Sequence, residues 1–161
     1  MNDPLNRARS YVYRLISRQS RTKKELLDKL KLKKYEEEVI NKIIKEAEEN
    51  GLIDDRRYSL AYASDRMNFF KSGKNLVRHK LQQKGIEKNL IDKAIEHTYK
   101  GVDEYVQALD LAKRRARSYR KLDKVVLARR LTGYIFRRGF SFDTALKVTK
   151  TIVKELEYEE E

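Results

Sequence analysis

One pattern is written three times along this sequence, and it constrains the fold more than any other feature. With Tyr35, Ile86 and Phe140 as anchors, successive copies lie 51 and 54 residues apart. Matching apolar or weakly apolar positions recur nine and five residues before each anchor and four and five residues after it. These positions are Leu26, Val77 and Leu131; Leu30, Leu81 and Ile135; Val39 and Ile40, Leu90 and Ile91, Thr144 and Ala145. A repeat of this length indicates small units arranged in tandem.

The repeated units are expected to be helical. Charged residues make up 39% of the 161 residues and proline occurs once, whereas Lys, Glu, Arg and Leu are good helix formers. A leading helix, at about 7–18, 55–70 and 103–120, precedes each copy of the pattern. The predicted fold class is all-α, with three tandem three-helix modules in an elongated, curved array. The predicted modules are 1–53, 54–102 and 103–154, followed by an acidic tail at 155–161. The tail is expected to be a frayed helix end or a solvated tail, and the alternative is that it screens the basic residues of the third module.

Local signals mark the helix ends. Thr22 and Glu25 have the spacing of a capping box, and Asp54 or Asp55 is placed to cap the following helix. Ser141 is placed to cap the last helix. The structural turns are assigned to Gly51, Gly85 and Gly139, because glycine tolerates the left-handed backbone that ends a helix. The first module has Lys34 where the others have glycine, so its turn is expected to be different or mildly strained.

The helix, turn and helix around Gly85 suggest a DNA-reading motif, but the charges argue against it. A recognition helix lies close to phosphates in the major groove. The helix after the first turn, EEEVINKIIKEAEEN, is strongly acidic, and the helix after the second turn carries Glu87, Asp92 and Glu96. Only the third, which has Lys147 and Lys150 beside Asp143, remains arguable. The turns are therefore interpreted as architectural.

Positive charge is concentrated in the first two helices of the modules. The formal net charge is +13; residues 7–34 hold eleven basic and two acidic residues, and residues 113–138 hold eleven basic and one acidic. Single charges are usually solvated, but KRRARSYRK and FRRGF fall in one module and would form a continuous basic stripe. Tyr119, Tyr134 and Phe136 are interleaved with it and could stack on bases, although helical spacing favours core positions for most of them. The candidate partner-facing residues are Arg56, Arg57, Arg66, Lys74, Arg78, Arg114, Arg115, Arg117, Arg129, Arg130, Arg137 and Arg138.

No pattern of catalytic or metal-ligating residues stands out. The chain has no cysteine, and His79 and His97 have no second ligand at metal spacing. There is no phosphate-cradling glycine loop and no serine nucleophile motif. We therefore expect neither an enzyme nor a cofactor. The N-terminal residues lack the apolar core of a signal peptide and no run is long enough to span a membrane, so we expect a soluble cytoplasmic protein.

Three motifs, taken in order, give this sequence a family resemblance. GLIDDRRYSLAYASDR (51–66), GKNLVRHKLQQKGI (73–86) and RRLTGYIFRRGFSFD (129–143) together resemble the bacterial RecX family over nearly the whole chain. The departures are Lys34 in place of the usual glycine, and the weakly apolar Thr144 and Ala145. They bear on the geometry of the turns.

The resemblance implies a regulatory protein that binds the RecA filament on single-stranded DNA. It implies a position in the helical groove of the filament and modulation, with inhibition expected, of the recombinase, ATPase and coprotease activities. The resemblance supplies no catalytic residues. An alternative is a sequence-nonspecific nucleic-acid-binding protein that competes for DNA, and a more remote one is a structural adaptor. The expected partners are the RecA filament and single- or double-stranded DNA bound weakly and salt-dependently, with no membrane, and a monomer is expected.

Overall fold

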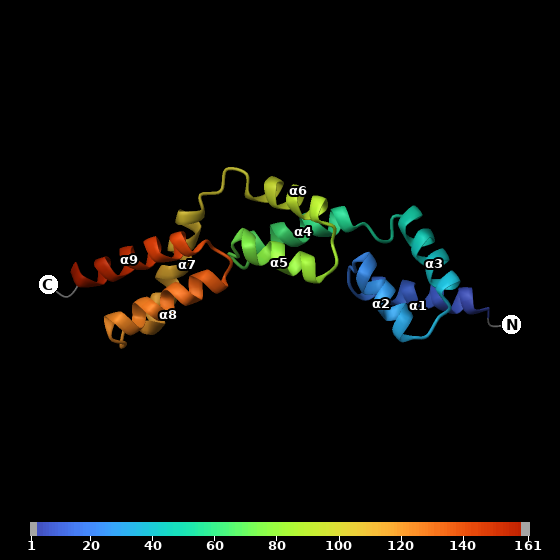
Figure 1. Cartoon of the computed structure of the whole chain (residues 1–161), viewed down its shortest axis with the longest axis horizontal. Helices are drawn as coiled ribbons and strands as arrows, with labels where there is room; N and C mark the ends of the chain where they lie inside the picture. The colour runs from blue at the N-terminus through green and yellow to red at the C-terminus, as the bar shows by residue number, and fades with distance from the viewer. Residues whose placement is uncertain (1–2, 159–161) are drawn as a thin grey trace. The chain divides into compact units, whose positions relative to one another are not determined.

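The computed structural model describes residues 3–158, and these residues form helices and turns without a strand. Figure 1 shows the order of the elements along the chain. The helices are α1 (Pro4–Arg18), α2 (Lys23–Leu32), α3 (Glu37–Glu49), α4 (Asp55–Asn68), α5 (Lys74–Gln83), α6 (Lys88–Tyr99), α7 (Glu104–Ala116), a 3₁₀ turn (Arg117–Tyr119), α8 (Lys124–Arg137) and α9 (Phe142–Tyr158). The all-α prediction and the three helices per module are confirmed.

The chain divides into two compact units. One comprises Met1–Ala61 and Lys80–Ala94, and the other comprises Tyr62–His79 and Ile95–Glu161. The division therefore passes through α4, α5 and α6, the three helices of the second module.

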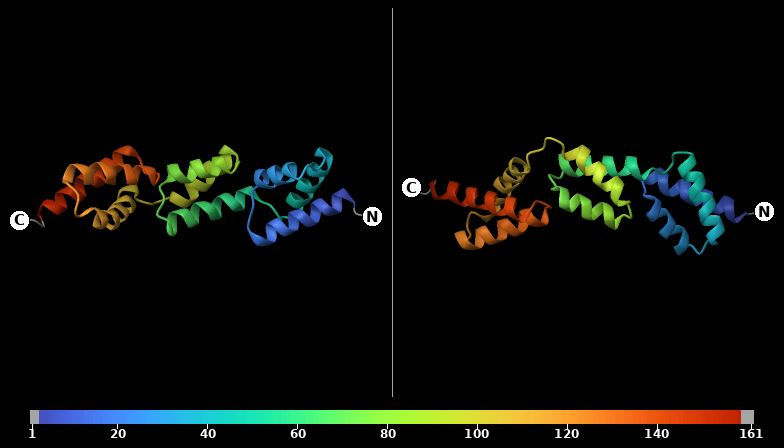
Figure 2. Two further views of the ribbon diagram at one scale, coloured as in Figure 1. Left: turned by 90° about the horizontal axis from the view of Figure 1, so that it is seen from below. Right: turned by 45° about the horizontal axis from the view of Figure 1, so that its top comes forward.

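The first unit contains the core of the first module. Apolar residues at helical spacing on α1, α2 and α3 form one buried cluster that also includes Ile53, just after α3. Figure 2 shows these three helices packed together near the N-terminus. The other buried members are Ala8, Val12, Leu26, Leu30, Ile40, Ile43, Ile44 and Ala47.

The second unit contains the core of the third module, between α7, α8 and α9. Phe140, the anchor of the third repeat, is fully buried there, as are Leu131 and Ile135. Ile86, the second anchor, is also buried, whereas Tyr35 is only partly buried. The anchor position of the first module therefore differs from the other two in its surroundings.

The repeated turns share one backbone conformation. Gly85 and Gly139 have φ of +77° and +93°, and Gly51, in the turn after α3, has φ of +64°. Lys34 has φ of +59°, so the turn of the first module is not different from the others, and of the two alternatives the strained turn is the correct one. The lysine side chain is exposed at this position.

Helix caps link the modules as well as ending the helices. The Thr22–Glu25 capping box is present: Thr22 Oγ1 accepts from Glu25 N at 3.2 Å and Glu25 Oε2 accepts from Thr22 N at 3.1 Å. Asp54 caps α4 by accepting from Arg57 N at 2.9 Å. Asp55 instead accepts from Lys23 N, at the start of α2, at 2.9 Å, and burial raises the pKa of its carboxyl group.

One pattern of contacts joins successive modules twice. In the first inter-module joint, Thr22 Oγ1 donates to the carbonyl oxygen of Lys84 at 2.8 Å, and a Cβ on Gly85 would overlap the side chain of Lys24. In the second, Gly73 N donates to the carbonyl oxygen of Arg138 at 2.8 Å, and Asn75 N to that of Gly139 at 3.1 Å. In each joint, the start of one module's second helix receives the turn that follows the second helix of the next module.

The ion pair of the first joint changes the pKa of both partners. Lys84 Nζ lies 2.8 Å from Glu25 Oε1. Burial opposes the ionisation of Glu25, but the hydrogen bonds from Lys84 and from Thr22 N outweigh it and lower the pKa of the carboxyl group. Burial also opposes the charge of Lys84, and its hydrogen bonds to Glu25 and Tyr58 outweigh burial and raise its pKa.

The ends of α7 and α9 differ from the sequence prediction, whereas the start of α9 agrees with it. The helix predicted at 103–120 ends at Ala116 and continues as the 3₁₀ turn, because Tyr119 and Leu122 turn in to pack on the core of the third module. Ser141 caps α9 as predicted, accepting from Thr144 N at 3.1 Å. Helix α9 continues to Tyr158, so the predicted acidic tail begins inside a helix, and residues 159–161 lie outside the described residues.

Candidate functional site

The three arginines at the end of α7 have different surroundings. Arg114 pairs with Asp110 on the same helix at 2.9 Å. Arg115 lies over the rings of Tyr119 and Tyr134, 4.9 Å from each centroid, and its Nε donates to the Tyr119 hydroxyl at 3.0 Å. Arg117 is exposed and makes no ion pair with a carboxylate of residues 3–156. The predicted trio thus contains one paired, one ring-bound and one unpaired arginine.

Helix α8 carries the other half of the predicted stripe. Arg129 and Arg130 are exposed, with no carboxylate partner in the described part of the chain. Arg137 is exposed and its guanidinium lies against Gly133: a Cβ there would be 3.1 Å from Arg137 Nη1. Arg138 is half-buried, and its Nε finds no hydrogen-bond partner within residues 3–158.

Arg115 brings the two basic segments of this module together. It extends from α7 to Tyr134 on α8, and helical spacing places Tyr134 on the same face as Arg130 and Arg138. Tyr119 and Tyr134 pack partly against the core, whereas Phe136 is 53% exposed and makes an edge contact with Phe142, with the ring centroids 6.0 Å apart. Of the three interleaved aromatics, only Phe136 is a surface residue.

The remaining predicted residues lie in both units. Arg56 and Arg57 are exposed near the start of α4 in the first unit, and Arg57 Nη2 donates to the carbonyl oxygen of Gly51 at 3.2 Å. In the second unit, Arg66 lies over the rings of Tyr62 and Phe70, at 5.0 and 4.5 Å. Lys74 is exposed at the start of α5, and Arg78 is half-buried on the same helix.

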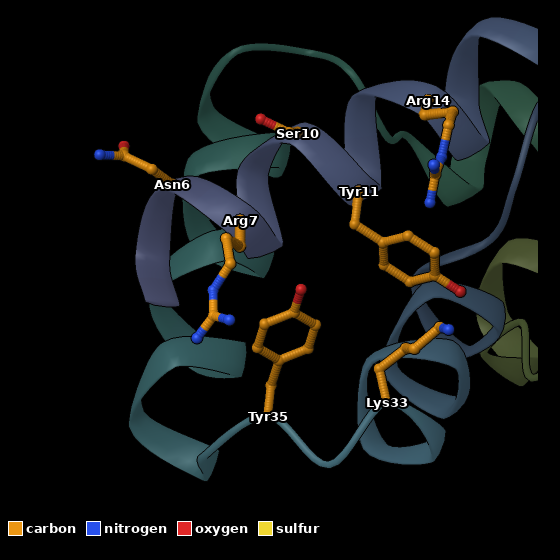
Figure 3. A pocket seen from close by; sticks show the side chains of 7 residues that line it. All are labelled: Asn6, Arg7, Ser10, Tyr11, Arg14, Lys33 and Tyr35. Atoms are coloured by element: carbon orange, nitrogen blue, oxygen red, sulfur yellow. The ribbon is translucent and has the colours of Figure 1, made fainter. Parts of the chain in front are cut away.

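A cleft on the first module contains cationic residues that the sequence had not singled out. It has a volume of about 570 Å³ and lies between α1 and the turn that joins α2 to α3. Figure 3 shows Arg7 directed toward the Tyr35 ring, and the Tyr11 ring between Arg14 and Lys33. The lining residues are Asn6, Arg7, Ser10, Tyr11, Arg14, Lys33 and Tyr35.

The charge of this cleft is not neutralised. None of its lining residues is acidic, and within residues 3–156 no carboxylate pairs with Arg7, Arg14 or Lys33. Arg14 and Lys33 both lie near the Tyr11 ring, 5.4 and 5.8 Å from its centroid. Other basic residues of the first unit do have carboxylate partners: Arg9 with Glu46, Lys23 with Glu48, Lys24 with Asp28, Lys42 with Glu38 and Lys84 with Glu25.

The eleven basic residues between positions 7 and 34 indicate a basic surface, but the sequence does not show which of them pair with a carboxylate.

The described residues contain no group of three or more His, Cys, Asp or Glu side chains that could hold a metal ion. No helix between residues 3 and 158 is long and apolar enough to cross a membrane. The exposed Arg and Lys side chains of the described surface can bind anions, and aromatic rings lie close to several of them.

Family comparisons match all three modules in order. The description "RecX, first three-helix domain" matches residues 8–46, "RecX, second three-helix domain" matches 54–95, and "RecX, third three-helix domain" matches 103–149. Together these matches cover most of the chain.

Individual relatives agree with the family comparisons. A protein of Streptomyces lividans named "Regulatory protein RecX" is 32% identical over 153 residues, covering 95% of this chain and 81% of its own length. A protein of the same name from Caldanaerobacter subterraneus subsp. tengcongensis is 29% identical over 140 residues, covering 87% of this chain and 68% of its own length. The crystal structure of RecX from Lactobacillus salivarius superposes with a TM-score of 0.76 at 26% identity, covering 98% of this chain and 99% of that one. A second crystal structure, of regulatory protein RecX, gives a TM-score of 0.81 at 27% identity, covering 92% of this chain and 74% of that one.

Proposed function

Because this chain belongs to the RecX family of regulatory proteins, we propose that it binds the RecA filament formed on single-stranded DNA and inhibits RecA. The activities inhibited are strand exchange, ATP hydrolysis and the coprotease function. The observation that carries this proposal is the match of all three family domains in their order over residues 8–149.

The charges of the third module support a partner that presents phosphates or carboxylates. Arg117, Arg129 and Arg130 are exposed and lack carboxylate partners within the described chain. Exposed arginines can bind phosphate or carboxylate through two parallel hydrogen bonds. Net charge of this sign also accelerates the encounter with a polyanion such as a nucleoprotein filament. We propose this module as the principal contact with the filament.

Charge reversal tests that assignment directly. Arg117, Arg129 and Arg130 changed together to Glu should weaken inhibition of RecA-driven ATP hydrolysis strongly, most of all at low ionic strength. These three are preferable to Arg114 and Arg115, which are engaged with Asp110 and with two tyrosine rings, so that their loss would also disturb α7. The variant should keep the helical circular-dichroism signal of the parent.

A control separates a specific surface from net charge. Lys31, Lys93 and Lys100 are also exposed, and their joint change to Glu alters the net charge by the same amount. We expect this control to inhibit RecA nearly as well as the parent. Equal loss of inhibition in both triple variants, or none in either, would remove the third module as the principal contact.

The second candidate function is sequence-nonspecific nucleic-acid binding, with inhibition by competition for DNA. The net charge of +13 favours it. Binding of the chain to RecA filaments and to bare single strands across a salt series distinguishes the two. A purely electrostatic DNA binder loses affinity for both with a steep slope. Under our proposal, the preference for the filament persists as the affinity for the bare strand falls.

We also propose the oligomeric state, the cellular location and the mode of action of the protein. It acts without catalysis of its own, as a monomer, in the cytoplasm, and needs no cofactor. Stoichiometric rather than catalytic inhibition is the expected behaviour in a titration against filament concentration. The names of the relatives, which are regulatory proteins, support a role without catalysis and bear on none of the other points.

A further inference from the structure

We propose that the cleft lined by Arg7, Tyr11, Arg14, Lys33 and Tyr35 binds a nucleoside phosphate. The ligand is one unit of a single-stranded nucleic acid or a free nucleotide, which share a phosphate and a flat base. The proposal starts from a comparison of the three repeated turns within the chain. Two of these turns are packed against another module, and the third borders this cleft.

The packed turns explain why glycine is needed where it occurs. At Gly139, a Cβ would overlap Leu76 and the backbone of Gly73 in the second inter-module joint. At Gly85, a Cβ would overlap the side chain of Lys24 in the first joint. Glycine at these positions therefore permits both the positive φ and the close approach of another segment.

The first turn has the same left-handed backbone at an exposed position. Lys34 takes the left-handed conformation at φ +59°, and both Lys33 and Lys34 are exposed. The hydrogen bonds of this turn run within its own helix end, from Lys33 N to Lys29 O, Lys34 N to Lys31 O and Tyr35 N to Leu30 O. The first turn carries two exposed lysines and a partly buried tyrosine, Tyr35.

The composition of the cleft fits a nucleoside phosphate. Three cations that have no carboxylate partner among the described side chains can hold a phosphate, with Arg7 and Arg14 on one helix and Lys33 on the facing turn. The rings of Tyr11 and Tyr35 lie among them (Figure 3) and offer surfaces on which a base can stack. The volume of about 570 Å³ lies within the range of small-ligand sites.

This site would extend the proposed function by adding a nucleic-acid contact on the first module. Its test needs no RecA, so it can fail while the filament proposal holds, and the reverse. The full-length chain is titrated into a short fluorescent oligothymidylate, and affinity is followed by fluorescence anisotropy over a salt series.

The first comparison removes the three cations. Arg7, Arg14 and Lys33 changed together to Ala should lower the affinity at least about tenfold and reduce the salt slope by roughly two. The control changes Lys45, Lys80 and Lys93, exposed lysines of the same unit, to Ala with the same change in net charge. Equal losses of affinity in the two triple variants would overturn the proposal.

The second comparison tests stacking. Tyr11→Leu should weaken binding roughly fivefold or more, because base–aromatic stacking contributes about 1–3 kcal/mol per base. Tyr11→Phe should restore most of the affinity, since it keeps the ring. Tyr11 also packs partly against the core of the first module, so thermal unfolding is measured for both variants. Equal weakening in Tyr11→Leu and Tyr11→Phe would show that the ring does not stack on a base.

Competition identifies the source of the ligand. Displacement of the oligothymidylate by ATP or thymidine monophosphate, but not by inorganic phosphate, identifies a free nucleotide as a ligand. Binding of the strand without such displacement identifies the strand as the source. Displacement of the oligothymidylate by polyglutamate as effectively as by unlabelled oligothymidylate would show that the cleft responds to negative charge alone, and the proposal would fail.

Discussion

At the scale of single residues, Lys34 shows what a left-handed turn costs when glycine is absent. A non-glycine residue in this region is less stable by roughly 1–2 kcal/mol. Because Lys34 is exposed and has φ of +59°, we expect Lys34→Gly to raise the free energy of unfolding by roughly 1 kcal/mol, after the added flexibility of glycine in the unfolded chain is deducted. Urea unfolding measures it. A less stable variant would mean that the lysine side chain stabilises the turn.

Glu25 gives the protein a pH dependence whose sign follows from its lowered pKa. A carboxyl group with a lowered pKa in the folded state stabilises the fold above its unfolded pKa, and this contribution is lost as the pH falls through the folded value. Glu25→Gln keeps an acceptor for Thr22 N but removes the ion pair with Lys84. We expect it to cost roughly 1 kcal/mol near neutral pH and less in acid.

Urea unfolding of parent and Glu25→Gln at neutral and at acidic pH provides the measurement. Glu38→Gln is the matched control, because Glu38 also has a lowered pKa through its hydrogen bond to Lys42 but is fully exposed to solvent. We expect a smaller effect from the control. A difference between parent and Glu25→Gln that grows on acidification would contradict the assigned sign.

Helix caps are the features of this structure that the sequence predicts best. The Thr22–Glu25 box and the Ser141 cap depend on neighbours three residues away, and both are present. Asp54 and Asp55 were indistinguishable by this criterion. Only the structure shows Asp55 accepting from Lys23, 32 residues earlier, because that contact depends on how the modules pack.

At the scale of elements, the second inter-module joint predicts unequal costs for two glycines that both have a positive φ. Gly51 and Gly139 both have positive φ, but a Cβ at Gly51 meets nothing within 4 Å, whereas one at Gly139 overlaps Leu76 and Gly73. We therefore expect Gly51→Ala to cost roughly 1 kcal/mol and Gly139→Ala clearly more than about 2 kcal/mol. Thermal unfolding of the two variants gives the comparison, and equal losses would mean that the joint adapts to a methyl group.

The elements themselves were predicted from apolar periodicity, and the joints between them were not. Repeats place Gly85 and Gly139 at equivalent positions, but the overlap with Lys24 or with Gly73 depends on residues in another module. The end of α7 was placed too late for a related reason. RARSYRK contains no glycine or proline to stop a helix, and the stop comes from Tyr119 and Leu122 packing on the core.

At the scale of the whole molecule, the sequence predicts how many basic residues the candidate surfaces contain but not which of them are free of ion pairs. Eleven basic residues between 7 and 34 and eleven between 113 and 138 are visible in the sequence. Which of them are neutralised depends on side chains that meet across helices, as in the pairs Arg9–Glu46 and Lys113–Glu155. The sequence therefore indicated an anionic partner, and the structure shows which described cations lack an internal carboxylate.

The net charge of +13 also bears on stability. Like charges repel one another in the compact state, and salt screens this repulsion over roughly 10 Å at 0.1 M. Added sodium chloride should therefore raise the melting temperature, even though it weakens exposed ion pairs such as Lys42–Glu38. Differential scanning calorimetry across a salt series provides the measurement. A falling melting temperature would mean that the ion pairs outweigh the repulsion.

The inter-module joints also set an order of events during folding. Contacts within a module can form as soon as its three helices exist, because they close short loops. Thr22, however, finds its partner Lys84 62 residues later in the chain, and Gly73 must wait for Arg138. Contacts between distant residues form slowly, and chains begin to fold from the N-terminal side during synthesis. During synthesis, we therefore expect the α2 cap and the core of the first module to form before its joint with Lys84, and each joint to close after the module that it joins has been made.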